Sequence, residues 1–74
     1  MATIYVYLLN ESVDVWRPVD AEYLGNDRYR IVSVNPHIED EEWQFGTGEV
    51  VLCSPRNLAG GSALVAYAAD ARSA

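Results

Sequence analysis

The sequence contains no lysine, a single cysteine and a single histidine, and its apolar runs are short. A membrane-spanning helix needs about 20 consecutive apolar residues, so such a helix is not expected. Cys53 has no partner for an internal disulfide or for a cysteine metal site, and we expect it to be a buried strand residue. The first residues alternate like a strand and lack the basic flank of a signal peptide, which predicts a cytoplasmic protein.

Catalytic groups are equally scarce. His37 lies in a polar loop segment, and Ser33, Ser54 and Cys53 lack the neighbours that activate a nucleophile. The pair Gly60-Gly61 lacks the lysine and the following helix of a phosphate-binding loop. We therefore expect a protein that is not an enzyme and that uses no cofactor.

The 74 residues suit a single domain covering the whole chain, 1–74. Half of them are hydrophobic, which is too many for a disordered chain. Eleven acidic residues against five arginines give a net charge of −6. Such a chain repels phosphate, so we expect no nucleic-acid partner. A basic protein or peptide partner fits this charge better, although the charge is also compatible with simple solubility.

Alternating apolar residues between turn-forming residues predict five strands, at 3–9, 13–24, 28–34, 49–53 and 63–69. The triplet Gly25-Asn26-Asp27 predicts a hairpin turn with positive φ angles. Residues 54–57 and 60–62 are expected to form turns, and 70–74 to fray or form one helical turn. This pattern predicts an all-β fold, either a small five-stranded barrel or a rolled antiparallel sheet.

The first strand is apolar on both faces. Ile4, Val6 and Leu8 alternate with a second apolar set, Tyr5, Tyr7 and Leu9. A 74-residue domain covers such a second face incompletely, so it favours a central position in the sheet or burial in a homodimer.

The segment Trp16-Arg17-Pro18 interrupts the second strand. Period-2 alternation places the valines of this strand inward and Trp16 outward. Proline cannot donate to a strand ladder, so Pro18 predicts an edge position or a bulge. A bulge turns Arg17 outward as well, and Trp16 with Arg17 then forms one exposed surface. Packing and ligand contact both remain open for Trp16.

Four consecutive carboxylates, Glu39 to Glu42, precede Trp43. They form a solvated loop, a surface for a basic partner or, least favoured, a site for a hard cation. Contiguous carboxylates point in different directions and lack the spacing of a calcium loop, so no metal is expected. Trp43 and Phe45 are expected to pack partly against the core.

The stretch Val15 to Ile31, with its glycine turn and tyrosine-bearing return strand, resembles the opening hairpin of SH3-like small barrels of the Tudor and KOW kind. The elements W-R-P-V at Trp16, E-W-x-F at Glu42 and G-x-V-V-x-C at Gly48 also resemble short bacterial proteins without an assigned activity. The resemblance covers about residues 13–53 and implies a fold rather than an activity.

Two functions follow as hypotheses. The first is a non-enzymatic protein or peptide interaction module that uses an aromatic and acidic surface. The second is a small acidic structural or inhibitory subunit that is homo-oligomeric, for example a homodimer, and binds a basic protein. The predicted partner-binding residues are Trp16, Arg17, Tyr29, Trp43, Glu39, Asp40, Glu41 and Glu42.

Overall fold

The computed structural model of the chain describes residues 1–35, 39–58 and 60–70. Within these ranges the protein is all-β, as the sequence predicts. Its six strands are β1 (Ala2–Leu9), β2 (Trp16–Gly25), β3 (Arg28–Ile31), β4 (Glu42–Trp43), β5 (Val50–Leu58) and β6 (Gly61–Ala69). Among the described residues, no helix is long and apolar enough to cross a membrane.

Five of the strands close into a hydrogen-bonded ring in the order β1-β2-β3-β5-β6, and β4 adds to β1 outside that ring. Four neighbouring pairs are antiparallel, but β6 lies parallel to β1, where Tyr5 faces Val65. The predicted all-β fold is confirmed, and this one parallel pair is the feature that a rolled antiparallel sheet would lack. A ring with an odd number of strands in alternating directions must contain one parallel pair, and here that pair is short. The result is a closed ring rather than a regular barrel.

The inward faces of the strands form one apolar core. Ile4, Val6 and Leu8 are buried, as the alternation of the first strand predicts, and so are Val19 and Ala21 of β2. The remaining buried apolar side chains come mainly from β3, β5 and β6: Ile31, Phe45, Val50, Val51, Cys53, Val65 and Ala66. The prediction of a buried cysteine is confirmed, since Cys53 is 2% exposed.

The turn between β2 and β3 is the hairpin turn that the sequence predicts, and its loop consists of two residues, Asn26 and Asp27. Asn26 and Asp27 have φ angles of 54° and 64°, and two positive φ angles define a type I′ turn. Gly25 precedes them with a φ of 92°, where the strand register shifts. Asparagine, aspartate and glycine tolerate this left-handed conformation better than other residues do.

Apart from β3, which ends at Ile31 instead of at 34, and the two-residue strand β4, which was not predicted, two strand boundaries differ from the prediction by three residues or more. β2 begins at Trp16, so Val13 lies in a loop and is 68% exposed instead of facing inward. The loop starts at Asn10, which has a φ of 62°, and the Tyr7 hydroxyl donates a 2.8 Å hydrogen bond to Asp14 across it. A regular strand cannot begin until the chain has made this turn.

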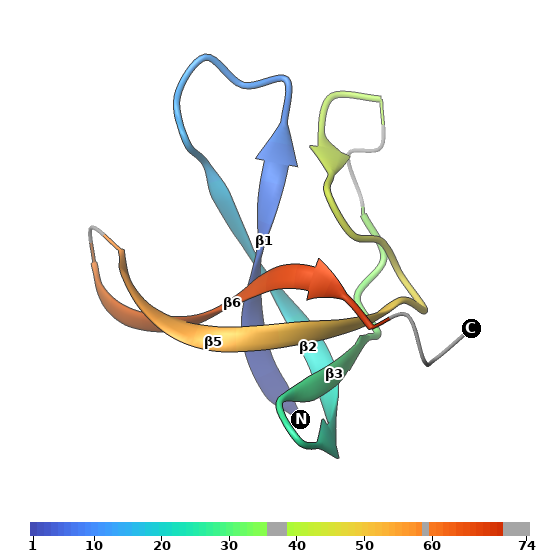
Figure 1. Cartoon of the computed structure of the whole chain (residues 1–74). Helices are drawn as coiled ribbons and strands as arrows, with labels where there is room; N and C mark the ends of the chain where they lie inside the picture. The colour runs from blue at the N-terminus through green and yellow to red at the C-terminus, as the bar shows by residue number, and fades with distance from the viewer. Residues whose placement is uncertain (36–38, 59, 71–74) are drawn as a thin grey trace.

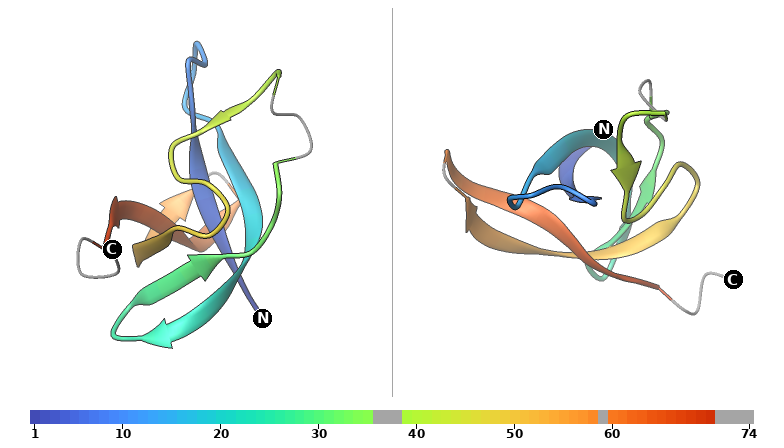
Figure 2. Two further views of the ribbon diagram at one scale, coloured as in Figure 1. Left: turned by 90° about the vertical axis from the view of Figure 1, so that its right-hand side faces the viewer. Right: turned by 90° about the horizontal axis from the view of Figure 1, so that it is seen from above.

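The second difference concerns β5, which continues through residues 54–57 where turns were predicted. Pro55 fits there because β3 pairs only with Val50 to Leu52, which leaves one side of β5 as a sheet edge. The resulting β5/β6 hairpin crosses the β1/β2 pair (Figures 1 and 2). The possible helical turn at 70–74 lies almost wholly outside the described residues.

At one end of the ring lie the N-terminus and the β2–β3 turn, and at the opposite end lie β4 and the loop between β1 and β2 (Figure 1). The acidic run and Trp43 belong to this second end.

Candidate functional site

Arg17 faces the inside of the ring, opposite to Trp16. The pairing of β1 with β2 runs without interruption through Tyr5↔Pro18, Val6↔Arg17 and Tyr7↔Trp16. Directly paired residues share a face, so Arg17 lies on the same side as the buried Val6. The predicted bulge at Pro18 is therefore wrong, and Trp16 and Arg17 do not share a surface. Pro18 is tolerated because β3 pairs with β2 only from Ala21 onward.

Glu41 explains why an arginine is accepted on the inward face. The Arg17 guanidinium donates through Nη2 to Glu41 Oε2 and through Nε to Oε1 at 3.2 Å. Their side chains are 42% and 15% exposed, so the pair is partly desolvated. A two-pronged contact between a guanidinium and a carboxylate fixes orientation as well as charge. The pair closes the core at the β4 end of the ring.

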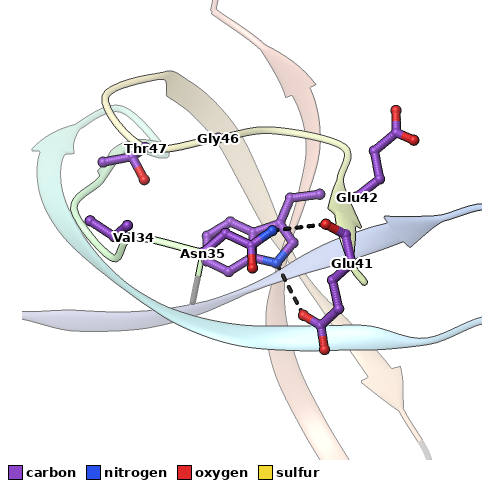
Figure 3. Close-up of a pocket in the computed structure, with 7 residues that line it drawn as sticks. Val34, Asn35, Glu41, Glu42, Gly46 and Thr47 are labelled. Atoms are coloured by element: carbon purple, nitrogen blue, oxygen red, sulfur yellow. Dashed lines mark hydrogen bonds between the residues drawn. The ribbon is translucent and has the colours of Figure 1, made fainter. Parts of the chain in front are cut away.

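Two further donors hold Glu41. Trp43 Nε1 donates to Glu41 Oε1 at 3.3 Å, and the Asn35 side-chain amide donates to the Glu41 main-chain oxygen at 2.9 Å. Both bonds are drawn in Figure 3. Asn35 comes from the segment after β3, whereas Trp43 belongs to β4. Glu41 therefore connects β2, β4 and the segment after β3.

Beside Glu41 lies a pocket of about 400 Å³, lined by Val34, Asn35, Glu41, Glu42, Trp43, Gly46 and Thr47. Figure 3 shows Val34 and Thr47 on one side of it and the two glutamates on the other, with Asn35 between them. Trp43 is half-buried and packs against the core. The partial core packing predicted for Trp43 is therefore confirmed.

A second hollow of about 340 Å³ adjoins the first, lined by Leu9, Asn10, Glu11, Glu39, Asp40, Glu41 and Glu42. Asn10 donates a 2.6 Å hydrogen bond to Glu42 Oε1 across it. Glu39, Asp40 and Glu42 are exposed. We call the two hollows together, with the residues that line them, the acidic-aromatic site.

The structure brings together six of the eight predicted binding residues. Trp43 and the four carboxylates line the acidic-aromatic site, and Arg17 supports it through Glu41. Trp16 lies on the outer face, where its ring packs edge-on against Tyr7 at 5.1 Å and under the Arg56 guanidinium at 5.8 Å. Packing contacts thus account for much of the Trp16 side chain, which is half-buried.

Tyr29 lies away from this site. It pairs with Tyr23 next to the β2–β3 turn, with ring centroids 5.1 Å apart, at the opposite end of the ring. The structure therefore does not place Tyr29 with the other predicted binding residues.

Asn35, Val34 and Thr47 were missed from the sequence. Asn35 precedes a proline, which marks a turn but gives no sign of a contact with Glu41. Val34 was predicted to end a strand, and it is instead 74% exposed at the rim of the pocket. The hint that the sequence gives for Val34 is its position immediately before the turn-forming residues Asn35 and Pro36.

Cys53 is the titratable group of the core whose pKa departs most from its ordinary value. Burial, with a smaller contribution from Asp27, raises the pKa of the Cys53 thiol to about 11, which keeps it protonated. Within residues 1–35, 39–58 and 60–70, no three His, Cys, Asp or Glu side chains are grouped as metal ligands. His37 lies outside these ranges.

No protein family, no curated protein and no solved structure in the comparisons matches this chain.

Proposed function

We propose that the protein is a non-enzymatic interaction module that binds a basic segment of a protein partner in the acidic-aromatic site. The observation that supports this most directly is the pocket of about 400 Å³ with an indole in its wall and carboxylates on its rim. Guanidinium and ammonium groups favour this combination, because a ring face and a carboxylate both attract a cation.

The carboxylates of the site differ in what they offer. Glu41 is held by the Arg17 guanidinium and the Trp43 indole, so we assign it a positioning role. Glu42, Asp40 and Glu39 are exposed and lie on the side of the second hollow. A basic side chain that enters between Trp43 and Glu42 meets a preorganised wall, and the other two carboxylates supply longer-range attraction.

The shape of the site favours an extended peptide over an isolated cation. The two hollows adjoin along Glu41 and Glu42, which line both. Adjacent pockets of this kind accept successive side chains of one strand-like segment. Val34 and Thr47 add an apolar wall that a compact ion does not use. We therefore propose a segment with at least one arginine as the ligand.

Isothermal titration calorimetry with the peptide Arg-Gly-Arg, whose two ends are capped to remove their charges, tests this proposal. The same peptide with citrulline keeps the shape and removes the charge, and it should not bind. The double variant Asp40→Asn/Glu42→Gln should weaken binding at least about fivefold, because neighbouring charges attract the ligand. The matched control is Glu22→Gln/Asp27→Asn, which neutralises two exposed carboxylates at the β2–β3 end of the ring, opposite to the site, and should leave binding unchanged.

The variant Trp43→Leu separates the contribution of the aromatic ring to peptide affinity from that of the carboxylates. It keeps an apolar side chain against the core but removes the ring face, and we expect about tenfold weaker binding. Trp16→Leu is the control on the outer face. Equal binding of the citrulline peptide, or equal weakening by both tryptophan variants, would contradict the proposed site.

The competing function, an acidic structural or inhibitory subunit, predicts another pattern. The net charge of −6 supports it. Binding through overall charge is indifferent to Trp43→Leu and falls steeply with added salt. A response to salt without a response to Trp43→Leu would favour this alternative.

We also propose that the ring is a variant of the SH3-like small barrels that residues 13–53 resemble. The β2/β3 hairpin with its type I′ turn supports this proposal. An experimental structure compared strand by strand with such barrels tests it, and the parallel β1–β6 pair is the feature to examine.

A further inference from the structure

Arg56 differs from the other arginines in the described part of the chain. Arg17, Arg28 and Arg30 each lie within 4 Å of a carboxylate, those of Glu41, Asp70 and Glu22 respectively. Within residues 1–35, 39–58 and 60–70, Arg56 has no carboxylate at that distance. Its guanidinium lies 5.8 Å from the centre of the Trp16 ring. In a protein with a net charge of −6, this cation is available to an acidic partner.

The position of Arg56 makes it accessible. Pro55, Arg56 and Asn57 are all exposed, and they lie in the part of β5 beyond its pairing with β3. This part of the β5/β6 hairpin projects from the ring (Figure 1). Its sequence, Pro55-Arg56-Asn57-Leu58, is a basic, extended segment of the kind proposed above as the ligand of the acidic-aromatic site.

We propose that a second copy of this chain is a ligand of the acidic-aromatic site, with the β5/β6 hairpin of one molecule docked through Arg56 beside Trp43 and Glu42 of the next. This inference rests on the proposed function. Charge complementarity supports it. The site carries Glu39, Asp40 and Glu42 on its exposed rim, and the hairpin carries Arg56, which has no carboxylate within 4 Å among the described residues. Among the described residues of one molecule, no ion pair joins the hairpin to the site.

The geometry of this contact determines the kind of assembly. Each contact joins a hairpin to a site, and every copy offers one of each. Where both hairpins of a pair reach the partner's site, the contact closes as a twofold dimer; where only one does, one hairpin and one site stay unused, and chains or larger rings form. One arginine and a shallow site make a small, transient interface, and the like net charges of the two copies oppose it. We therefore expect association only at high protein concentration.

Sedimentation equilibrium of the full chain over a wide concentration range tests the inference. The wild-type protein should show an average mass that rises with concentration to that of a dimer or beyond. Arg56→Gln and Asp40→Asn/Glu42→Gln should each raise the dissociation constant at least about tenfold. Circular dichroism spectra identical to that of the wild type establish that both variants fold.

Mixing the two variants gives the decisive result. Arg56→Gln retains the acidic-aromatic site, and Asp40→Asn/Glu42→Gln retains the hairpin, so together they form one intact interface. An equimolar mixture should contain heterodimers and nothing larger. A mixture that stays monomeric while the wild type assembles would overturn the inference, as would assembly of Arg56→Gln alone to the wild-type extent.

The peptide titration separates this inference from the proposed function. Wild-type protein that binds the arginine peptide but remains monomeric at millimolar concentration overturns the second-copy ligand and leaves the site intact. Assembly that the arginine peptide inhibits and the citrulline peptide does not inhibit supports both. Failure to bind the peptide combined with a monomeric state overturns both.

Discussion

The ion pair between Arg17 and Glu41 should couple these residues more strongly than the cross-strand ion pair between Arg30 and Glu22 does. Arg17→Met keeps the aliphatic stem of the side chain and removes the charge. Glu41→Gln keeps Oε1 as an acceptor for the Trp43 indole. With the double variant, these changes form a mutant cycle that isolates the interaction free energy of the pair.

The expected magnitude follows from exposure and geometry. Exposed pairs contribute about 0.2–1 kcal/mol, whereas breaking a buried pair costs about 3–5 kcal/mol. Arg17 and Glu41 are 42% and 15% exposed and are joined by two bonds, which places them between these limits, at about 1.5 kcal/mol. Arg30 and Glu22 are 48% and 55% exposed and are joined at 3.0 Å, so their cycle should give about 0.3 kcal/mol.

Urea unfolding followed by tryptophan fluorescence measures both cycles. The two cycles share one wild type, so seven proteins are measured, and their free energies of unfolding should show the larger coupling for Arg17 with Glu41. Equal coupling energies in the two cycles, within about 0.3 kcal/mol, would refute the reasoning from partial burial. So would a stabilising effect of Arg17→Met alone, since that variant leaves Glu41 without its guanidinium.

Three further outcomes are expected. Because the pKa of Cys53 is raised from 9.0 to about 11, the folded state retains the thiol proton longer than the unfolded state does. The contribution of Cys53 to the free energy of unfolding should therefore be fully present below pH 9 and be lost as the pH rises toward 11. Over this range the wild type should lose about 2–3 kcal/mol more than Cys53→Ala does, and urea unfolding of both proteins at several pH values measures the difference. Asp27→Gly should raise the free energy of unfolding by about 0.5 kcal/mol in the same assay, because glycine adopts the φ of 64° without strain. Ile31→Ala should cost about 2–5 kcal/mol, because Ile31 is 1% exposed and its truncation leaves a cavity; thermal unfolding measures the loss.

The elements that sequence predicts well here are those set by local chemistry. Alternation alone identifies the inward residues Ile4, Val6 and Leu8, and the turn residues identify the β2–β3 hairpin. The parallel contact of Tyr5 with Val65 has no local signal, because neither strand carries a mark of its neighbour. Strand pairing between distant segments is decided by the packing of the whole ring.

The candidate site likewise combines features that the local sequence predicts with features that depend on the whole fold. The acidic run and Trp43 lie together in sequence and were predicted as one surface. The placement of Arg17 was wrong because its partner, Glu41, is 24 residues away and lies in a different element. A charged residue at an inward position suggested an outward bulge, whereas the structure supplies a counter-charge instead. Asn35 was missed for the same reason, since its contact with Glu41 depends on the fold.

The single parallel contact between β1 and β6 has a consequence for how the ring forms and opens. β1 and β2 pair along six residue positions and β5 and β6 along eight, whereas β1 pairs with β6 at one position. The hairpins are local in sequence, but this seam joins segments about 60 residues apart and incurs the largest loss of chain entropy on closure. It should therefore be the last contact to form during folding. Amide hydrogens along the seam should exchange with solvent through local opening before those of the β5/β6 ladder.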